Sequence, residues 1–168
     1  MSGPGGGVGA GRGEPVPGGA DRVRLEVRRL RADAVLPAYA HPGDAGLDLA
    51  AVEPARLWPG ERVAVATGLA LHIPDGWVGL VHPRSGLARR QGLTVANAPG
   101  TIDAGYRGEV QVLLVNLGAE VVDIEAGDRI AQLLLQRVGW AEVVEVEGLP
   151  GSVRGDGGFG STGVAGRR

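Results

Sequence analysis

The 168-residue chain contains neither cysteine nor lysine. Without cysteine it cannot form a disulfide, a thiolate nucleophile or a cysteine-ligated zinc site, and it suits a reducing compartment, so the cytoplasm is the expected location. Without lysine it cannot form a Schiff base with a substrate or build a Walker-type phosphate loop. All 17 basic residues are arginines, so a small anionic ligand held by a few guanidinium groups remains an option.

Aromatic residues make up only 4% of the chain, although 43% of it is hydrophobic. The core must therefore be aliphatic, and its β-branched members favour sheet. A formal net charge of −2 argues against general nucleic-acid binding, which needs a basic surface. No run approaches the roughly 18 apolar residues of a membrane span, and the N-terminus lacks a signal-peptide core. We expect a soluble chain with no nucleic-acid or membrane partner.

Glycine is concentrated at both ends, with nine of the 31 glycines in residues 1–20 and seven in residues 149–168. The first segment is a Gly- and Pro-rich sequence of low complexity, for which we expect a disordered leader. The last segment contains an ordered-looking glycine string, which we interpret as a flexible active-site arm and tail. Residues 21–148 then form one domain, as the chain length suggests.

Between the two ends, apolar residues recur with a period of two, which predicts strands. Val23, Leu25 and Val27 alternate with charged residues. Similar runs occupy residues 63–71, 77–82, 109–116, 130–138 and 141–146. Turn signals rich in Pro and Gly separate these runs, and one short helix is expected near residues 86–91. The pattern predicts an all-β sandwich or barrel.

Residues 44–49 set Asp44 and Asp48 four positions apart in a stretch that contains glycine and leads into a possible strand. Taken alone, such carboxylates are typical of turn caps. A similar interpretation applies to residues 127–132, where a turn precedes a strand. Asp128 and Gln132 are therefore structural unless other motifs converge on them.

Residues 83–87 read Pro-Arg-Ser-Gly-Leu and open the expected helix after a strand. The Arg84 guanidinium, the Ser85 hydroxyl and the amides of Ser85 and Gly86 are candidates to face one phosphate. Serine is also common as a helix N-cap for purely structural reasons. The string alone favours neither role.

Residues 97–108 form a glycine-spaced hairpin that carries Asn97, Asp103 and Tyr106. A carboxylate among glycines can approach a ligand closely, and a tyrosine ring can lie flat beneath a sugar. The alternative is a hairpin whose polar tips have no chemical role. The residue types favour a functional hairpin modestly.

Residues 155–160 match the dinucleotide-binding pattern G-x-G-x-x-G, but only eight residues follow Gly160. The long helix that this motif must open therefore has no room. An arm whose amides wrap phosphates fits better, with Arg154 as a charge and Phe159 as a base-stacking ring.

Nucleophilic enzymes fit the sequence poorly. No serine stands in a G-x-S-x-G string, and the three histidines lack metal-ligand spacing. The remaining chemistry is an acidic base that activates water while Mg²⁺ neutralises phosphate.

Taken in chain order, the five strings resemble the five motifs of the trimeric deoxyuridine triphosphatase (dUTPase) family, and the match runs over residues 23–163. The resemblance implies a distorted jelly-roll subunit, a β-barrel or sandwich, that assembles as a homotrimer. Active sites would lie between subunits, and the arm of one chain would close a site built by the other two. The implied reaction converts dUTP to dUMP and pyrophosphate, which keeps uracil out of DNA and supplies dUMP for dTMP synthesis.

The resemblance also assigns roles to residues. Asp103 would be the general base, and Tyr106 would pack against deoxyribose and exclude a 2′-hydroxyl. Uracil would be read by Asn97 and by backbone near Thr101, Ile102 and Gln111. Phosphates would be held by Arg84, Ser85, Gly86 and Gln132, and the arm would act through Arg154, Phe159, Gly160 and Ser161. Mg²⁺ would be held chiefly by the triphosphate without a direct protein ligand, and Asp48 and Asp128 would support the site.

Two other functions remain open. The dCTP deaminases share the fold and part of these motifs, but they resemble Arg-Ser-Ser where this chain has Arg84-Ser-Gly86, and they lack the full arm. A non-catalytic nucleotide-sensing trimer would need the arginines and amides but not Asp103. The presence of Asp103 together with the whole arm favours turnover.

Overall fold

The computed structural model describes residues 22–153 together with residues 155 and 156. These form, in chain order, β1 (Glu26–Arg29), β2 (Leu47–Ala50), β3 (Ala55–Leu57), β4 (Arg62–His72), β5 (Trp77–His82), α1 (Ser85–Gln91), β6 (Leu93–Val95), β7 (Gly100–Ile102), β8 (Glu109–Asn116), β9 (Val122–Ile124) and β10 (Arg129–Arg137). The prediction of an all-β fold with one short helix is confirmed. None of the described helical segments is long and apolar enough to cross a membrane.

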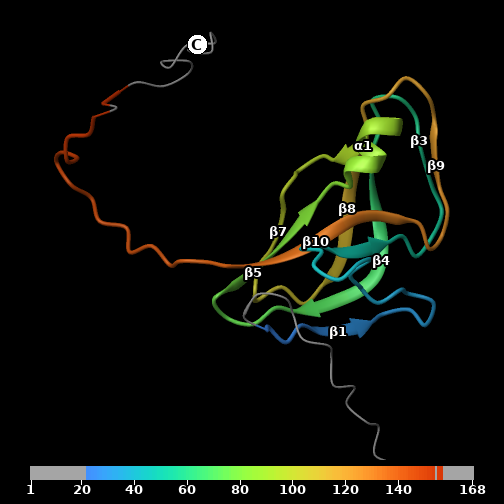
Figure 1. Cartoon of the computed structure of the whole chain (residues 1–168), viewed down its shortest axis with the longest axis horizontal. Coiled ribbons are helices and arrows are strands. Elements are labelled where there is room, and N and C mark those ends of the chain that lie inside the picture. The colour runs from blue at the N-terminus through green and yellow to red at the C-terminus, as the bar shows by residue number, and fades with distance from the viewer. Residues whose placement is uncertain (1–21, 154, 157–168) are drawn as a thin grey trace, which may run out of the picture.

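Two antiparallel four-stranded sheets make up the body of the molecule. Their strand orders are β1-β4-β8-β6 and β2-β10-β5-β7, and β3 pairs with β9 in a small third sheet. Figure 1 shows β3 and β9 at one end of the body, beside α1. Strands that follow one another in the chain alternate between sheets, as in a jelly-roll sandwich. The predicted architecture of the subunit is therefore confirmed.

The core lies between the two large sheets and is aliphatic. Leu49 of β2, Leu114 of β8 and Leu133 of β10 are fully buried, and burial of each such side chain contributes about 1.5–3 kcal/mol. No aromatic residue of the described part belongs to the buried cluster, although Trp77 packs against it. The aliphatic core expected from the composition is therefore confirmed.

The strand predicted at residues 141–146 is wrong. Residues 138–153 form neither helix nor strand, and they lead away from the body (Figure 1). Trp140 and Val143 are 90% and 92% exposed. Alternating apolar residues become a strand only where a sheet edge satisfies their backbone groups, and within the described residues no strand of the chain pairs with this segment.

The N-terminal end differs less from expectation. β1 begins at Glu26 and not at Val23, although Val23 and Leu25 keep the alternating burial. The leader at residues 1–20 lies outside the described residues, as do Arg154, Phe159, Gly160 and Ser161 of the predicted arm. The boundaries of the leader and the arm stay predictions.

Candidate functional site

The turn between β5 and α1 presents the first group of predicted site residues. Arg84 is the residue that precedes the helix, with extended backbone angles of φ −92° and ψ 122°, and no side chain caps the helix by a hydrogen bond. Ser85 is thus the first helical residue, so the N-cap interpretation of Ser85 is wrong. Its exposed hydroxyl is not used as a cap, and the amides of a first helical turn have no acceptor within the helix.

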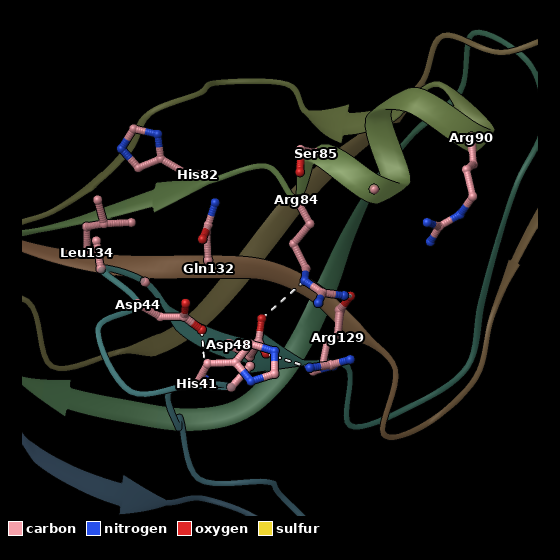
Figure 2. A pocket seen from close by; sticks show the side chains of 14 residues that line it. His41, Asp44, Asp48, His82, Arg84, Ser85, Arg90, Arg129, Gln132 and Leu134 are labelled. Carbon is pink, nitrogen blue, oxygen red and sulfur yellow. Dashed lines mark hydrogen bonds and ion pairs between the residues drawn. The ribbon is translucent and has the colours of Figure 1, made fainter.

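A cavity of about 640 Å³ opens at this turn. It gathers residues from three places in the chain: the stretch that leads into β2, the turn between β5 and α1, and β10 (Figure 2). Five of the predicted site residues line it together, namely Asp48, Arg84, Ser85, Gly86 and Gln132. The sequence alone left open whether Gln132 lies near the other predicted site residues. The structure shows that it lines the same cavity.

Asp48 holds two arginines at the floor of this cavity. Its Oδ1 lies 3.1 Å from Arg84 Nε, and its Oδ2 lies 2.9 Å from Arg129 Nη1. Arg84 also donates from Nη1 to the carbonyl oxygen of Arg129 at 3.1 Å. The Asp48 side chain is only 16% exposed, so solvent screens these ion pairs less than it screens pairs at the surface. One carboxylate faces two guanidinium groups, which leaves the cluster with an excess of positive charge.

Gln132 fixes the backbone just before Arg84. Its Nε2 donates to the carbonyl oxygen of Pro83 at 3.1 Å, so the β10 side chain sets where the turn after β5 begins. Gly46 makes room for this contact, because a Cβ there would lie 2.4 Å from Gln132 Oε1. The glycine between the two aspartates is therefore required by packing against Gln132.

Asp44 and Asp128, the other two aspartates singled out in the sequence, accept hydrogen bonds within turns. Asp44 Oδ2 accepts a hydrogen bond from the His41 amide at 2.8 Å, as the turn-cap interpretation predicts. Asp128 Oδ2 accepts one from the Glu125 amide at 2.9 Å, while the Asp128 carbonyl accepts one from the Ala51 amide at 2.8 Å. Asp128 thus ties its turn to the end of β2, the strand that carries Asp48.

The hairpin of residues 97–108 forms the second group. The Asn97 side chain lies over Gly100, where a Cβ would be 3.3 Å from its Nδ2. The side chain of Ile102 is buried in the core, so Ile102 has only its backbone to offer a ligand. Thr101 and, on β8, Gln111 are exposed.

Asp103 and Tyr106 stand on the exposed turn of this hairpin. The Tyr106 amide donates to the Asp103 carbonyl at 3.0 Å, and the Tyr106 hydroxyl donates to the Glu109 carbonyl at 2.9 Å. Tyr106 is nevertheless 46% exposed. The carboxylate and the ring are therefore presented at the surface and not inside the cavity.

The two groups lie apart within one chain. β7 pairs with β5 so that Ile102 stands opposite Gly79, which precedes Arg84 by five residues. Since a strand rises by about 3.3 Å per residue, Ile102, the residue before Asp103, lies about 17 Å from Arg84 along the strand direction. The structure therefore brings together the residues predicted to bind phosphate, and separately those predicted for uracil, sugar and water.

Sequence reasoning missed Arg90 and Arg129, which both line the cavity. Arg90 lies one helical turn after Gly86, and a Cβ at Gly86 would lie 3.1 Å from its Nη1. The spacing of four residues within a helix is a signal that could have placed Arg90 beside Gly86. Arg129 offered no such signal, because it follows a turn and precedes a bulge in β10.

Solved structures of similar fold include the dUTPase of Staphylococcus bacteriophage 80alpha with dUPNHPP. It has a TM-score of 0.79 and 32% sequence identity, and the match covers 84% of this chain and 99% of that one. A mutant dUTPase from phage phi11 of S. aureus matches with a TM-score of 0.70 and 30% identity, over 75% of this chain and 98% of that one. Its structure is described as revealing the coordination of a structural Mg(II) ion.

Two relatives in sequence carry the same name. The deoxyuridine 5′-triphosphate nucleotidohydrolase of Thermobifida fusca is 61% identical over 142 residues, which cover 84% of this chain and 79% of the relative. The enzyme of the same name from Rhodococcus erythropolis is 52% identical over 145 residues, covering 86% and 88%. The family model described as dUTPase matches residues 32–163. By this match and by the identity to these relatives, the chain belongs to the dUTPase family.

Proposed function

We propose that this protein hydrolyses dUTP to dUMP and pyrophosphate, by attack of water on the α-phosphorus. The observation that carries the proposal is the cavity at the β5–α1 turn, where Arg84 and Arg129 share Asp48 and leave an excess of positive charge. A triphosphate is the part of dUTP that such a site suits. The reaction would keep uracil out of DNA and supply dUMP for dTMP synthesis.

Asp103 is the proposed general base. Its exposed position on the hairpin turn gives a water molecule access to the carboxylate, and a positioned carboxylate can remove the proton as the water attacks. Tyr106 stands on the same turn, where its ring would pack against deoxyribose. A ring at that place leaves no room for the 2′-hydroxyl of UTP.

Uracil recognition is assigned to the same hairpin. Asn97 provides both a donor and an acceptor, and the backbone near Thr101, Ile102 and Gln111 would complete the contacts to the polar edge of the base. A close backbone would leave no room for the methyl group of thymine. Cytosine presents the reverse order of donor and acceptor, so the same groups would reject it.

Phosphate binding is assigned to the cavity. Arg84 is aimed by the Asp48 carboxylate and by the Arg129 carbonyl, so its guanidinium is ordered before a ligand arrives. The free hydroxyl of Ser85 and the amides of Ser85 and Gly86 add donors beside it, and Gln132 holds the backbone in place. Ordered donors of this kind stabilise charge that develops during phosphoryl transfer.

The donor set fits a magnesium ion carried by the substrate. Among the described residues no group of three or more His, Asp or Glu side chains could hold a metal ion, and Asp48 already faces two arginines. Mg²⁺ is often bound through substrate phosphates and water with few direct protein ligands. When bound, the ion would neutralise charge on the triphosphate, while Arg84 and Ser85 hold the phosphates that carry it.

A complete site is proposed to need more than one subunit. The separation of about 17 Å between the start of the hairpin turn and Arg84 supports this view. The exposed apolar side chains of residues 138–153, such as Trp140 and Val143, also point to a partner surface. We assign that partner to further copies of this chain in a homotrimer. The arm, within residues 149–168, would close a site built by the two other subunits and would act through Arg154, Phe159, Gly160 and Ser161.

A nucleotide screen tests the reaction. Purified protein with Mg²⁺ is given each of the deoxynucleoside triphosphates and UTP in turn, and the release of pyrophosphate is measured. Release from dUTP alone is the expected result. Ammonia release from dCTP would instead identify a deaminase, and tight binding of dUTP without pyrophosphate would identify a nucleotide sensor.

A further inference from the structure

β4 contains a bulge opposite the start of β8. Ala66 stands opposite Gln111 and Ala70 stands opposite Glu109, so residues 67–69 of β4 face Val110 alone. Extra residues in one strand leave backbone groups without their partners in the ladder. Such groups inside a sheet must be satisfied by other means.

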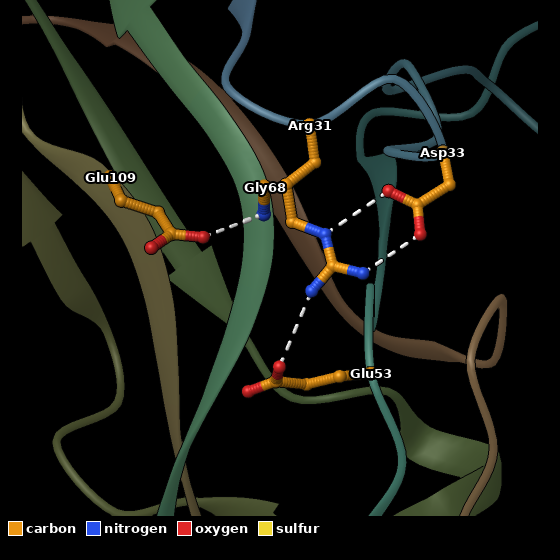
Figure 3. Close-up of polar contacts among 5 residues, drawn as sticks. All are labelled: Arg31, Asp33, Glu53, Gly68 and Glu109. Carbon is orange, nitrogen blue, oxygen red and sulfur yellow. Dashed lines mark hydrogen bonds and ion pairs between the residues drawn. The ribbon is translucent and has the colours of Figure 1, made fainter.

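Two side chains supply the missing partners. The fully buried Thr67 donates from its hydroxyl to the Val110 carbonyl at 2.6 Å. The Gly68 amide donates to Glu109 Oε1 at 2.8 Å (Figure 3). Gly68 has a φ of +68°, and a Cβ there would lie 2.9 Å from the Cβ of Ala34, so glycine is needed for both conformation and space.

Glu109 links this bulge to the hairpin. Its side chain binds β4 through Gly68, and its carbonyl accepts the hydroxyl of Tyr106 at 2.9 Å. The Tyr106 ring lies against the backbone between them, because a Cβ at Gly108 would be 2.5 Å from the Tyr106 hydroxyl oxygen. Tyr106 in turn donates through its amide to the Asp103 carbonyl. Glu109 is the first residue of β8, whose backbone also pairs with β4 at Ala70, so its side chain adds a second tie between the exposed turn and that sheet. At the other end of the turn, β7 pairs with β5.

We propose that Glu109 is a positioning residue that sets the place of Tyr106 and, through it, of Asp103. The proposal rests on the proposed function, in which Tyr106 selects deoxyribose and Asp103 is the base. A ring excludes a 2′-hydroxyl only if it cannot move away. The carboxylate at the bulge provides that restraint, so Glu109 affects the choice between dUTP and UTP without touching either nucleotide.

The ion pairs on the other side of the same bulge offer matched controls. Arg31 contacts Asp33 at 2.8 Å and Glu53 at 3.4 Å. Figure 3 shows these side chains beyond β4, away from Glu109. Glu53 is therefore an acidic residue near Gly68 that no hydrogen bond among the described residues connects to the hairpin, although the charge of Glu109 also acts on Arg31.

The test compares Glu109→Ala, Glu109→Gln and Glu53→Ala with the unaltered protein. We expect Glu109→Ala to lower the ratio of kcat/KM for dUTP to kcat/KM for UTP by about ten- to hundredfold, as for loss of a hydrogen bond to a charged group. Glu109→Gln keeps an acceptor oxygen and should restore most of the ratio. Glu53→Ala should leave it unchanged. A lower Tm in Glu109→Ala with an unchanged ratio would overturn the proposal and leave Glu109 with a structural role only.

Tyr106→Phe provides a second variant that leaves the bulge intact. It removes only the hydroxyl that binds the Glu109 carbonyl, and we expect the dUTP/UTP ratio to fall as well. A ratio equal to that of the unaltered protein would contradict the link between the two residues, even if Glu109→Ala failed to fold.

Amide hydrogen exchange separates this proposal from the proposed function. Faster exchange in residues 103–108 of Glu109→Ala, but not of Glu53→Ala, is expected whether or not the protein is an enzyme. If the unaltered protein released no pyrophosphate, the proposed function would fail, and the exchange rates would still decide whether Glu109 holds the hairpin. Equal exchange in the two variants would show that it does not.

Discussion

The cavity at the β5–α1 turn and the hairpin of residues 97–108 are built in opposite ways. Polar side chains in the cavity are held by partners on other strands, as Asp48 of β2 holds Arg84 and Arg129. The hairpin presents Asp103 and the Tyr106 ring at the surface, tied mainly by contacts near its own ends. The cavity is thus ordered within one chain, whereas the hairpin shows its chemical groups to whatever packs against it.

The largest loss of activity is expected from a substitution in the hairpin. Asp103→Asn keeps the size of the side chain but removes the base, and a positioned general base is typically worth about 100- to 10,000-fold in rate. We expect binding of a non-hydrolysable dUTP analogue to persist in isothermal titration while pyrophosphate release is lost. Near-normal hydrolysis by this variant would remove Asp103 from its assigned role.

Mixing two defective chains tests whether the cavity and the hairpin act in different subunits. Asp103→Asn and Arg84→Ala should each be almost inactive alone. If each site takes its base from one subunit and its arginine from another, random mixing restores about one site in four. Pyrophosphate release from the mixture measures this recovery, and native mass spectrometry confirms that the subunits have exchanged. No recovery after proven exchange would place both residues in a site of one chain.

Many residues of the cavity and the hairpin could be predicted from the sequence because they lie beside strands with regular period-two alternation. β5 and β8 have the bounds that the period-two pattern predicts, and turns rich in Pro and Gly separate them. Arg129 and Glu109 could not be found this way. Each takes part in a contact made beside a β-bulge, where the pairing register shifts, and period-two reasoning assumes that no register shift occurs.

The misassigned strand at residues 141–146 shows a different limit. Val144 and Val146 alternate with Glu145, as residues of a strand do, but both valines are exposed. A periodic pattern reports what a segment can pair with, and the partner need not belong to the same chain. The same reasoning explains why the sequence alone did not separate the cavity from the hairpin, since both depend on which strands become neighbours.

A smaller loss of activity is expected when the Asp48 carboxylate in the cavity is replaced by an amide. Asp48→Asn cannot neutralise Arg84 and Arg129 together, so the Arg84 guanidinium loses its fixed direction. We expect kcat/KM for dUTP to fall by about tenfold, the size of a lost charged hydrogen bond. Steady-state kinetics measures this change.

The smallest effect is expected from an aspartate–arginine pair outside both regions. Asp33 is exposed, and the hydrogen bond from Arg31 holds the pKa of its carboxyl below the ordinary value of 3.8. A carboxyl with a lowered pKa in the folded state stabilises the fold above its unfolded pKa, and this contribution is lost as the pH falls through the folded pKa. The difference in Tm between the unaltered protein and Asp33→Asn should therefore be present at neutral pH, begin to shrink near pH 3.8, and vanish as the pH falls through the lower pKa of the folded state.

Asp33→Asn and Asp48→Asn are the same chemical change at two places, so they compare an exposed ion pair with the ion pairs of the cavity. Exposed ion pairs are screened by solvent and salt, so raising the ionic strength should shrink the Tm difference for Asp33→Asn. Its kcat/KM for dUTP should not change, since neither Arg31 nor Asp33 lines the cavity, and among the described contacts the Arg31 side chain hydrogen-bonds only to Asp33 and Glu53. A drop in activity as large as that of Asp48→Asn would mean that the charge pairs of the cavity have no special part in holding phosphate.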